Sequence, residues 1–370
     1  MQSHPPNTAA LSAVLRIKAG LCPFERLEDI TVDFRNHAPF LDQFLSSDTR
    51  LGIVLGPYGT GKTHFLQLTR KNALSEKFAV AHLGLDTGLS SLNHPQRHVL
   101  TIFRSLTLPA PYGFFAEWMG TMLDDPMHAR HLEESFIELR ADCPSVVDAA
   151  LWIMRQADKT LRSTLLLEYL SGALLVAKTA HSSSRLRAYE LVRFWSTFCT
   201  RILGVKGLVL LIDELENLFS NALYWSILSR RSAYRTLSFY TESLQSAKTL
   251  CALTPEGLKL FRVEIQNLSA GLLGDLQQVS GEKFTEFLGR VEKTRVHELS
   301  PFGQEQYRML HLRLAALHAE ARGYPNQTSG RLAATSLTGP GITPRIFAKS
   351  VLSALERDWF TRKSQTSREE

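Results

Sequence analysis

The chain has 370 residues, of which 44% are hydrophobic and 21% are charged, and its formal net charge is +6. This composition supplies a buried core for one large domain or two modest ones, and it excludes a wholly disordered chain. The four cysteines form no CxxC pair and lie at no metal-binding spacing with histidine, which argues against a disulfide framework. Because the N-terminus also lacks the apolar core of a signal peptide, we expect a cytoplasmic protein.

The first part of the chain alternates strand and helix patterns. Residues 1–48 form a lead-in with short helical patterns, and the continuous apolar strand Arg50–Leu55 follows them. A helix, a second strand and a second helix come next, at Lys62–Leu74, Phe78–Asp86 and His94–Leu106. Apolar strands that alternate with helices are typical of a parallel sheet covered on both faces, so we predict an α/β, doubly wound parallel-sheet fold.

The next strong strand, Gly207–Asp213, begins roughly 120 residues after Asp86, several times the length of an ordinary crossover. The interval contains helical patterns, and we predict an all-helical insertion over residues 110–203 with a flexible joint at Ser182–Ser184. Its most apolar helical stretch, Ser163–Ala180, contains two charged residues. The apolar run is too short to span a bilayer, so no membrane partner is expected.

The rest of the chain completes the sheet and then becomes helical. Strand patterns occur at Lys248–Thr254 and Arg295–Ser300, and only helical patterns follow. The predicted organisation is a lead-in, a split core, an insertion, a lid and a polar tail, at residues 1–48, 49–109 with 204–300, 110–203, 301–363 and 364–370.

The stretch GPYGTGKT at residues 56–63 fits the phosphate-binding pattern G-x-x-x-x-G-K-[ST] in full. Glycines let the backbone turn tightly, so that successive N–H groups point at one anion, and the following helix directs its positive dipole end there. Lys62 can bridge the terminal phosphates, and Thr63 can offer its hydroxyl to Mg²⁺. The alternative is a glycine-rich turn that matches the pattern by chance. The strand before the loop and the helix after it, which a phosphate-binding loop requires, argue against this alternative. We expect the nucleotide to contact Gly56, Pro57, Tyr58, Gly59, Thr60, Gly61, Lys62, Thr63 and His64.

Asp213 and Glu214 follow an apolar run at the carboxyl end of a strand, where ligands bind in open α/β sheets. Asp213 can hold Mg²⁺, and Glu214 is placed to polarise the attacking water, which favours hydrolysis over nucleotide storage. An apolar run before an Asp is a weak pattern when it occurs alone. Here it occurs in the same chain as the phosphate-binding loop, and together the two motifs predict a nucleotide site. No Asn-Lys-x-Asp pattern for guanine is present, so ATP is the expected nucleotide.

Two further polar residues are candidates for the same chemistry. Thr254 ends a strand that is expected beside the two phosphate-handling strands, where it could orient the water; it could equally cap the helix that starts at Pro255. Arg345 falls in the first turn of a helix capped by Thr343, where a cation opposes the helix dipole. That placement is easier to understand if Arg345 faces an anion such as the γ-phosphate, although an exposed surface arginine would fit the same sequence.

The order of P-loop, LLIDE, a polar residue on the next strand and a helical lid with TPR resembles the AAA+ ATPases. This resemblance implies that Thr254 is the first sensor and Arg345 the second. It also implies an arginine finger that acts on a neighbouring subunit's nucleotide, and so a homo-oligomer. Arg290, Arg295 and the Arg230–Arg235 region are the alternatives for the finger.

A narrower resemblance rests on the residues that flank these motifs. VLRIKAGLCP, GPYGTGKTHFLQL, VAHLGLD, LLIDELENL and ALTPEGL are similar to the P-loop ATP-binding proteins of BREX-type phage-resistance systems. The similar motifs extend over about half of the chain, whereas the insertion and the lid match only in general character. The resemblance implies a bacterial cytoplasmic ATPase that works on DNA with other defence-system proteins.

Basic residues gather at three places, each with an aromatic residue nearby in the sequence. They are Arg185, Arg187 and Arg193; Arg230, Arg231 and Arg235; and Arg357, Arg362 and Lys363. Such groups could follow the phosphates of double-stranded DNA without reading bases, but solvated helix faces have the same composition. The function hypotheses are therefore a DNA-associated ATP-driven motor or switch, and a regulatory or assembly ATPase, such as a transposition-type regulator, that recruits proteins without touching DNA. A small-molecule phosphotransferase is disfavoured, because no acceptor site is evident.

Overall fold

The computed structural model describes residues 7–32, 34–85, 92–156, 159–173, 182–220, 226–271, 286–287, 289–324 and 342–369. The chain forms two compact units, each built from separate stretches of sequence. Unit 1 contains Met1–Asp42, Leu55–Leu68 and Glu298–Glu370, and unit 2 contains Gln43–Val54 and Thr69–His297. Residues 1–42 of the lead-in, the P-loop and the lid therefore belong to one unit.

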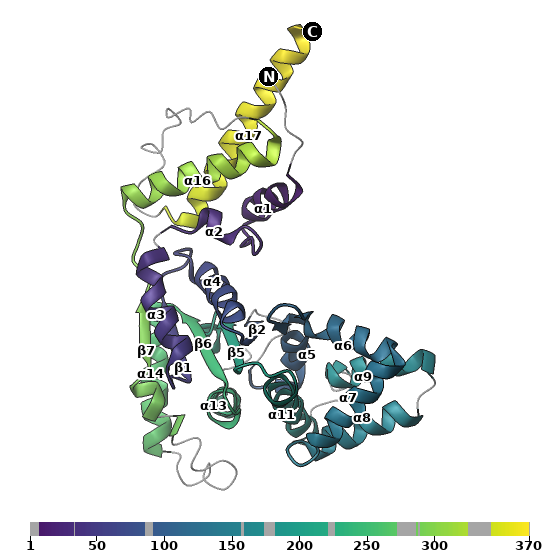
Figure 1. The fold of residues 1–370 in the computed structure, drawn as a ribbon. Helices are drawn as coiled ribbons and strands as arrows, with labels where there is room; N and C mark the ends of the chain where they lie inside the picture. Colours follow the sequence, from purple (N-terminus) through teal and green to yellow (C-terminus); the bar gives the residue numbers. More distant parts are fainter. Residues whose placement is uncertain are drawn as a thin grey trace. The chain divides into compact units, whose positions relative to one another are not determined.

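Unit 1 is built on three helices, α1 (Thr8–Ala19), α16 (Gln304–Arg322) and α17 (Pro344–Glu369). On α1 the buried residues are Ala10, Ala13, Val14 and Ile17, a spacing that places them along one face of the helix. They share a core with Leu314 of α16, Phe347 and Leu352 of α17, and further apolar residues of the same helices. In Figure 1 the purple α1 lies against the yellow-green α16 and the yellow α17, although about 300 residues separate them in sequence.

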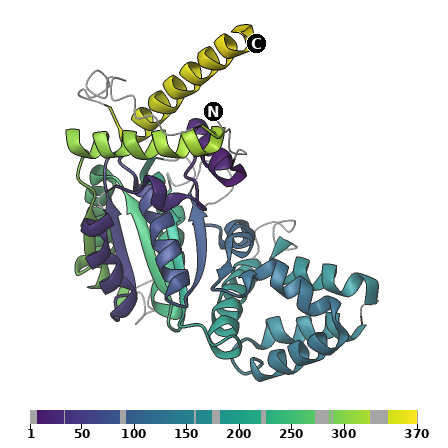
Figure 2. The same cartoon turned by 45° about the horizontal axis from the view of Figure 1, so that its top comes forward.

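The ends of these helices follow their local sequence. Asn7 caps α1 through its side chain, and Gly20 ends this helix in the left-handed conformation. Gly323 ends α16 in the same way, as the sequence predicts. Helix α17 continues to Glu369, through residues predicted to be a polar tail. Figure 2 shows this yellow C-terminal part projecting away from α16, and its described residues beyond Trp359 are exposed.

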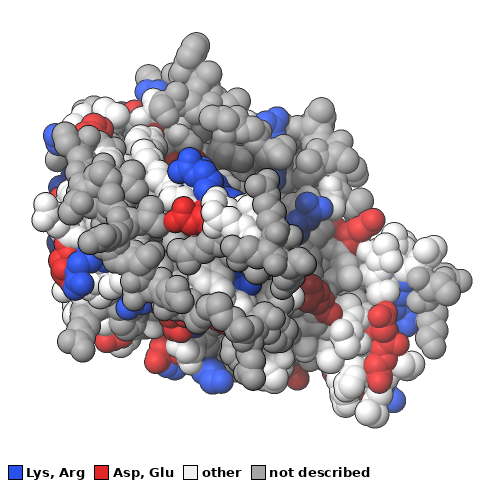
Figure 3. All heavy atoms as spheres, turned by 90° about the horizontal axis from the view of Figure 1, so that it is seen from above, with Lys and Arg blue, Asp and Glu red and all other residues white. Residues whose placement is uncertain are grey.

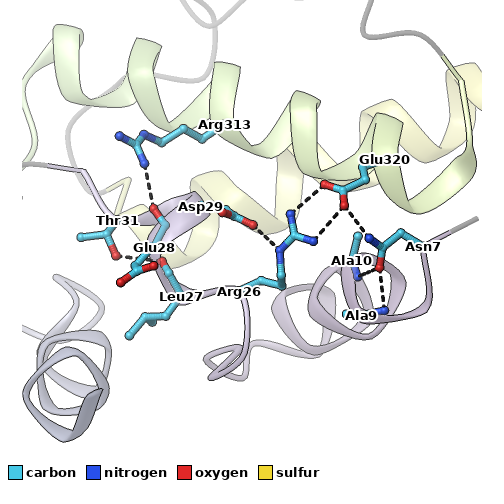
Figure 4. Close-up of polar contacts among 10 residues, drawn as sticks. All are labelled: Asn7, Ala9, Ala10, Arg26, Leu27, Glu28, Asp29, Thr31, Arg313 and Glu320. Atoms are coloured by element: carbon cyan, nitrogen blue, oxygen red, sulfur yellow. Dashed lines mark hydrogen bonds and ion pairs between the residues drawn. The ribbon is translucent and has the colours of Figure 1, made fainter. Parts of the chain in front are cut away.

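A polar network joins the lead-in to α16 (Figure 4). Arg26 donates two hydrogen bonds to the carboxylate of Glu320, at 2.9 Å and 2.7 Å, and Asn7 donates a third at 2.6 Å. Asp29, in the short helix α2 (Leu27–Ile30), also binds Arg26, and Arg313 donates to the carbonyl oxygen of Glu28 at 2.8 Å. Two parallel charge-assisted bonds hold a guanidinium and a carboxylate in a fixed geometry, so the network fixes the path of the lead-in.

We expect Arg26→Gln to lower the free energy of unfolding by about 1 kcal/mol, because a bidentate pair is lost where its side chains are 24% and 40% exposed. Arg308→Gln is a matched control on α16, since its pair with Glu305 is 63% and 65% exposed and should contribute less to the free energy of unfolding. Urea unfolding of both variants measures the difference. Equal losses would show that the Arg26 network contributes no more than a surface ion pair.

Unit 2 contains nearly all of the central sheet, whose strand order is β4-β3-β2-β5-β6-β1-β7. The strands are β1 (Leu51–Leu55), β2 (Ala79–Gly84), β3 (Thr107–Leu108), β4 (Gly113–Phe114), β5 (Leu208–Asp213), β6 (Lys248–Leu253) and β7 (Arg295–Glu298). β2, β5 and β6 pair in parallel, and every residue of β1, β5 and β6 is buried. The predicted α/β class is confirmed, and β6 lies between β1 and β5 as expected.

The antiparallel pair β3 and β4 extends the sheet beyond β2 and was not predicted. Each strand has two residues, too few to show an alternating pattern in the sequence. The other predicted strands are correct to within one or two residues at the ends that the structure describes, and Asp86 lies outside the described residues.

The helices of the predicted insertion are present in the described ranges. They are α6 (Phe115–Asp124), α7 (Pro126–Glu138), α8 (Pro144–Gln156), α9 (Lys159–Leu170), α11 (Ser182–Thr197) and the π-helical segment η1 (Phe198–Ile202). Figure 1 shows α6 to α9 as one group, and α11 packs against both α8 and α5 (Pro95–Ser105). The flexible joint predicted at Ser182–Ser184 is wrong, because these residues begin α11, consistent with the preference of serine for helix starts.

The other helices of the described ranges are α3 (Phe34–Ser46), α4 (Lys62–Ser75), α12 (Asn217–Ser220), α13 (Ile227–Ser238), the π-helical η3 (Phe239–Ser243) and α14 (Pro255–Gly271). None of the helices in the described part of the chain combines the length and the apolar character that crossing a lipid bilayer requires.

Candidate nucleotide-binding site

The P-loop connects β1 to α4 and has the conformation that its glycines allow. The backbone N–H and the hydroxyl of Thr60 donate to the carbonyl oxygen of Pro57, at 3.4 Å and 2.8 Å, which closes a tight turn. Gly59 lies within this turn at φ +79°, a region that side chains disfavour. A Cβ atom on Gly56 would lie 2.5 Å from the Thr60 hydroxyl oxygen. The turn therefore depends on glycine at both positions.

Lys62, the first residue of α4, directs its ammonium group back into the loop. The residue is 7% exposed, and its Nζ donates to the carbonyl oxygens of Gly56 at 2.8 Å and Pro57 at 3.3 Å. The same Nζ lies 5.0 Å from the ring centroid of Tyr58, which is 68% exposed. A cation held inside a turn of backbone amides, at the start of a helix, fits a phosphate group.

The first turn of α4 supplies backbone donors to the same place. The hydrogen-bond ladder begins with Phe65 N–H donating to the carbonyl oxygen of Gly61 at 2.8 Å, so the N–H groups of Lys62, Thr63 and His64 precede it. These residues are three of the nine predicted to contact the nucleotide. The donor set of ammonium, amides and the Thr63 hydroxyl is the set that a nucleotide triphosphate with Mg²⁺ requires.

The side chain of His64 points away from that donor set and joins α4 to the lead-in. The hydroxyl of Thr31 donates its proton to the carbonyl oxygen of Leu27 at 2.8 Å. Its oxygen also lies 2.9 Å from His64 Nε2, so in that hydrogen bond the Thr31 oxygen is the acceptor. His64 is thus protonated on Nε2, and Nδ1 accepts from the thiol of Cys22 at 3.7 Å. Any contact of His64 with phosphate would have to come from its backbone. The sequence alone did not reveal that His64 binds Cys22 and Thr31.

Burial, together with the nearby His37, lowers the pKa of His64 to about 4. The unfolded chain should bind a proton there near pH 6.5, so between these values only the unfolded state is protonated. We therefore expect this residue to reduce the free energy of unfolding by roughly 3 kcal/mol as the pH falls from 6.5 to 4.

Urea unfolding across this pH range measures the effect. His64→Gln keeps a donor for Thr31 but has no titration, so its stability should fall less steeply with acid than that of the wild type. The exposed His128→Gln should behave as the wild type does. Identical pH profiles for His64→Gln and the wild type would contradict the assignment.

The start of α17 lies against the P-loop. A Cβ atom on Gly59 would lie 2.7 Å from the hydroxyl oxygen of Thr343, and the same oxygen caps α17 by accepting from Ile346 N–H at 3.4 Å. The predicted cap is therefore confirmed, and it touches the loop at Gly59. This contact depends on packing between segments almost 300 residues apart, which no local sequence pattern indicates.

Arg345 is exposed in the first turn of α17, as predicted, and lies beside the end of α1. A Cβ atom on Gly20 would lie 2.9 Å from Arg345 Nη2 and 2.8 Å from Lys349 Nζ. Gly20 is the C-terminal cap of α1, where the helix dipole is negative and favours cations. The structure thus provides a second reason for an arginine at this position, besides a phosphate.

Asp213 and Glu214 lie in unit 2, at the end of β5. Asp213 is 6% exposed and accepts a hydrogen bond from the Glu214 N–H at 3.0 Å. Glu214 is exposed and has φ +59°, a conformation that costs a residue with a side chain about 1 kcal/mol or more. Asn217 donates to the Glu214 carboxylate at 3.2 Å and to the carbonyl oxygen of Leu85 at 2.5 Å. Asn217 was missed by the sequence analysis, and it holds Glu214 in this orientation.

Thr254 follows β6, beside β5, and is 5% exposed. Its hydroxyl oxygen accepts from Gly257 N–H at 3.1 Å, and its carbonyl oxygen accepts from Leu258 N–H at 2.9 Å. Thr254 therefore caps α14, which is the alternative that the sequence left open. The hydroxyl proton takes no part in this bond.

Two of the arginines considered for a finger, Arg290 and Arg230, are engaged within unit 2. Arg290 binds the carboxylate of the buried Glu242 through two nitrogens, at 2.7 Å and 3.1 Å. Arg230 pairs with Glu264 at 3.0 Å. Arg295 is exposed on β7, the strand at the edge of the sheet.

A comparison with protein families agrees with the P-loop motif of the sequence. The model of a family described as BREX system ATP-binding protein BrxC/D matches residues 8–108, which include most of the lead-in, the P-loop and β2. No curated protein matches the sequence. Among solved structures, the chain is similar to the Aeropyrum pernix ORC2 protein in its ADPNP–ADP complexes, with 11% identity and a TM-score of 0.33. The similarity covers 86% of this chain but only 66% of that one.

Proposed function

We propose that this protein is an ATPase of the AAA+ type that works within a bacterial phage-defence complex acting on DNA. The observation that carries the proposal is the P-loop, in which Lys62 points into a turn of backbone amides at the start of α4. The match of residues 8–108 to a family of ATP-binding proteins from one defence system supports both the nucleotide and the pathway.

Within this proposal, Lys62 and the amides of the P-loop bind the phosphates. Thr63 and Asp213 hold Mg²⁺, which, when bound, offsets charge on the phosphate oxygens. Glu214 polarises the attacking water, and Asn217 holds the Glu214 carboxylate in place. Thr254 and Arg345 keep their proposed roles as sensors of the water and of the γ-phosphate. We favour Arg295 over Arg290 and Arg230 as the finger toward a neighbouring subunit, because the latter two already bind carboxylates.

The proposed partners are further copies of this chain, other proteins of the defence system and double-stranded DNA, in the cytoplasm. The alternative function is a regulatory or assembly ATPase, such as a transposition-type regulator, that recruits proteins and makes no direct contact with DNA. The family match favours the phage-defence reading, and it applies to both modes of action.

ATPase assays of the whole chain with and without duplex DNA, across a salt series, separate the two functions. We expect hydrolysis that DNA stimulates and that salt suppresses, since phosphate contacts weaken as salt rises. Hydrolysis without any response to DNA would favour the assembly ATPase, and no hydrolysis under any condition would overturn the proposal. Sizing the protein with ATP, with ADP and without nucleotide tests the oligomer separately.

A further inference from the structure

Three arginines from two helices of unit 2 meet next to the segment that follows β2. We call Arg185 of α11 and Arg231 and Arg235 of α13 the guanidinium cluster. Arg185 donates to the carbonyl oxygen of Asn93 at 3.1 Å, and Ser232, between the two α13 arginines, donates to the same oxygen at 3.1 Å. Arg231 and Arg235 are four residues apart and so share one side of α13.

Within the described ranges, no carboxylate forms an ion pair with any of these three arginines. The Nε atoms of Arg231 and Arg235 are buried and form no hydrogen bond with a described group. Arg230, on the same helix, is the contrasting case, because Glu264 neutralises it at 3.0 Å. The cluster is therefore an excess of positive charge in a half-buried position, with donors left over for a ligand.

The electrostatics of the surrounding groups agree with this geometry. Burial lowers the pKa of Arg235, and the charges of Arg185 and Arg231 lower it further. Burial likewise lowers the pKa of His94, with added repulsion from Arg97 and Arg185. Gathering like charges in this way is unfavourable for folding, so a bound anion would relieve a cost that the described residues leave in place.

The ligand that fits best is a chain of phosphates. The cluster consists of arginines alone, whose forked donors match the oxygens of phosphate, and the exposed Arg97 adds positive charge near His94, which Arg185 also repels. Nucleic acid supplies phosphates in series, and counterions released from it favour binding to several cations at once. On the face shown in Figure 3, blue and red side chains are interspersed, so net charge alone does not mark that surface for nucleic acid.

The neighbouring aromatic residues are not arranged to read bases. Tyr189 of α11 stacks on Phe239 with 4.4 Å between ring centroids, and its hydroxyl lies 2.9 Å from that of Thr236. Tyr234 is 1% exposed, and its hydroxyl donates to Glu264 at 2.9 Å. Tyr234 is thus part of the core, and the half-buried Tyr189 is stacked on Phe239, so neither ring is presented for base stacking of the kind seen in single-strand binding proteins.

We infer that the guanidinium cluster binds the phosphodiester backbone of a nucleic acid without reading its sequence. This inference deepens the proposed action on DNA. The inference is tested by measuring nucleic-acid binding in the absence of ATP. Failure to bind nucleic acid would not contradict the ATPase proposal, and failure to hydrolyse ATP would not contradict the proposed role of the cluster.

The test compares two double variants of the whole chain that lose the same charge. Arg231→Gln with Arg235→Gln removes two members of the cluster, and Arg187→Gln with Arg230→Gln removes two arginines outside it from the same two helices. Fluorescence anisotropy measures binding to labelled duplex and single strands of about 30 nucleotides, across a salt series. Polyglutamate is the competitor that represents an acidic protein.

We expect the cluster variant to bind nucleic acid about tenfold or more weakly than the wild type. Its slope of log affinity against log salt should fall by about one to two units, whereas the control variant should keep most of both. Stronger binding to either strand form identifies which backbone the site accepts. The melting temperature of the cluster variant should equal or exceed that of the wild type, because repulsion is relieved.

Three results would overturn the inference. The first is equal loss of binding in both double variants, which would indicate a general charge effect. The second is displacement by polyglutamate as effective as that by unlabelled DNA, which would indicate a protein ligand. The third is a marked fall in melting temperature for the cluster variant only, which would show that the arginines stabilise the fold.

Discussion

Glu214→Gln is expected to bind ATP about as tightly as the wild type and to hydrolyse it about 10²- to 10⁴-fold more slowly. The substitution removes the carboxylate that would polarise water but keeps the size of the side chain and its acceptor for Asn217. The residue is exposed and takes φ +59°, which a glutamine tolerates as well as a glutamate does, so the local backbone should not change. Strain at an exposed acidic residue beside Asp213 is consistent with a functional role for its orientation.

Single-turnover hydrolysis and nucleotide binding, measured on the same preparation, separate the two effects. Glu256→Gln is the control, because it removes an exposed glutamate from the first turn of α14. Normal turnover in Glu214→Gln would show that another group activates the water. Loss of both binding and turnover would instead show that Glu214 contributes to holding the nucleotide.

Lys62→Ala is expected to weaken ATP binding by about 10- to 100-fold and to abolish most hydrolysis. Its ammonium is the only charged group that the described P-loop, residues 56–63, directs into its own turn. A bond from a charged donor to a phosphate is stronger than one from a neutral donor, so the amides alone should not compensate. The carbonyl oxygen of Gly56 would lose the Lys62 donor, whereas that of Pro57 would keep its bonds from Thr60, so a small loss of stability should follow.

Lys71→Ala is the matched control for this variant, because it removes a lysine from the same helix, α4, two turns beyond the loop. Titration with a fluorescent ATP analogue measures binding, and urea unfolding reports any change in stability. Unchanged nucleotide affinity in Lys62→Ala would rule out the P-loop as the phosphate site, whatever the fate of hydrolysis.

The elements that sequence reasoning located correctly are those with strong local patterns. The strands β1, β5 and β6 are continuous apolar runs, and the glycines at 56, 59 and 61 with Lys62 form a pattern that has one structural meaning. Gly323 and Thr343 end and begin helices through their own backbone and side-chain chemistry. Strands of two residues, such as β3 and β4, carry no such pattern and were missed.

The candidate site was predictable in part for the same reason. The loop, Asp213 and Glu214 are recognisable from adjacent residues, but the use of each side chain depends on distant ones. Thr254 could cap a helix or orient water in any sequence of this kind, and the packing of Gly257 against it shows that it caps α14. Asn217 has no signature of its own, because its role requires Leu85 to come near Glu214.

The sequence by itself therefore determined the α/β class, the phosphate-binding loop and the acidic pair, since each depends on residues close together in the chain. Only the tertiary structure decided that the lead-in and the lid share one core, that His64 binds Cys22 and Thr31, and that Thr343 touches Gly59. The guanidinium cluster belongs to the same group, because α11 and α13 meet only through folding at Asn93. Hydrophobic burial brings these segments together without regard to their separation in sequence, so no local pattern records which of them will meet.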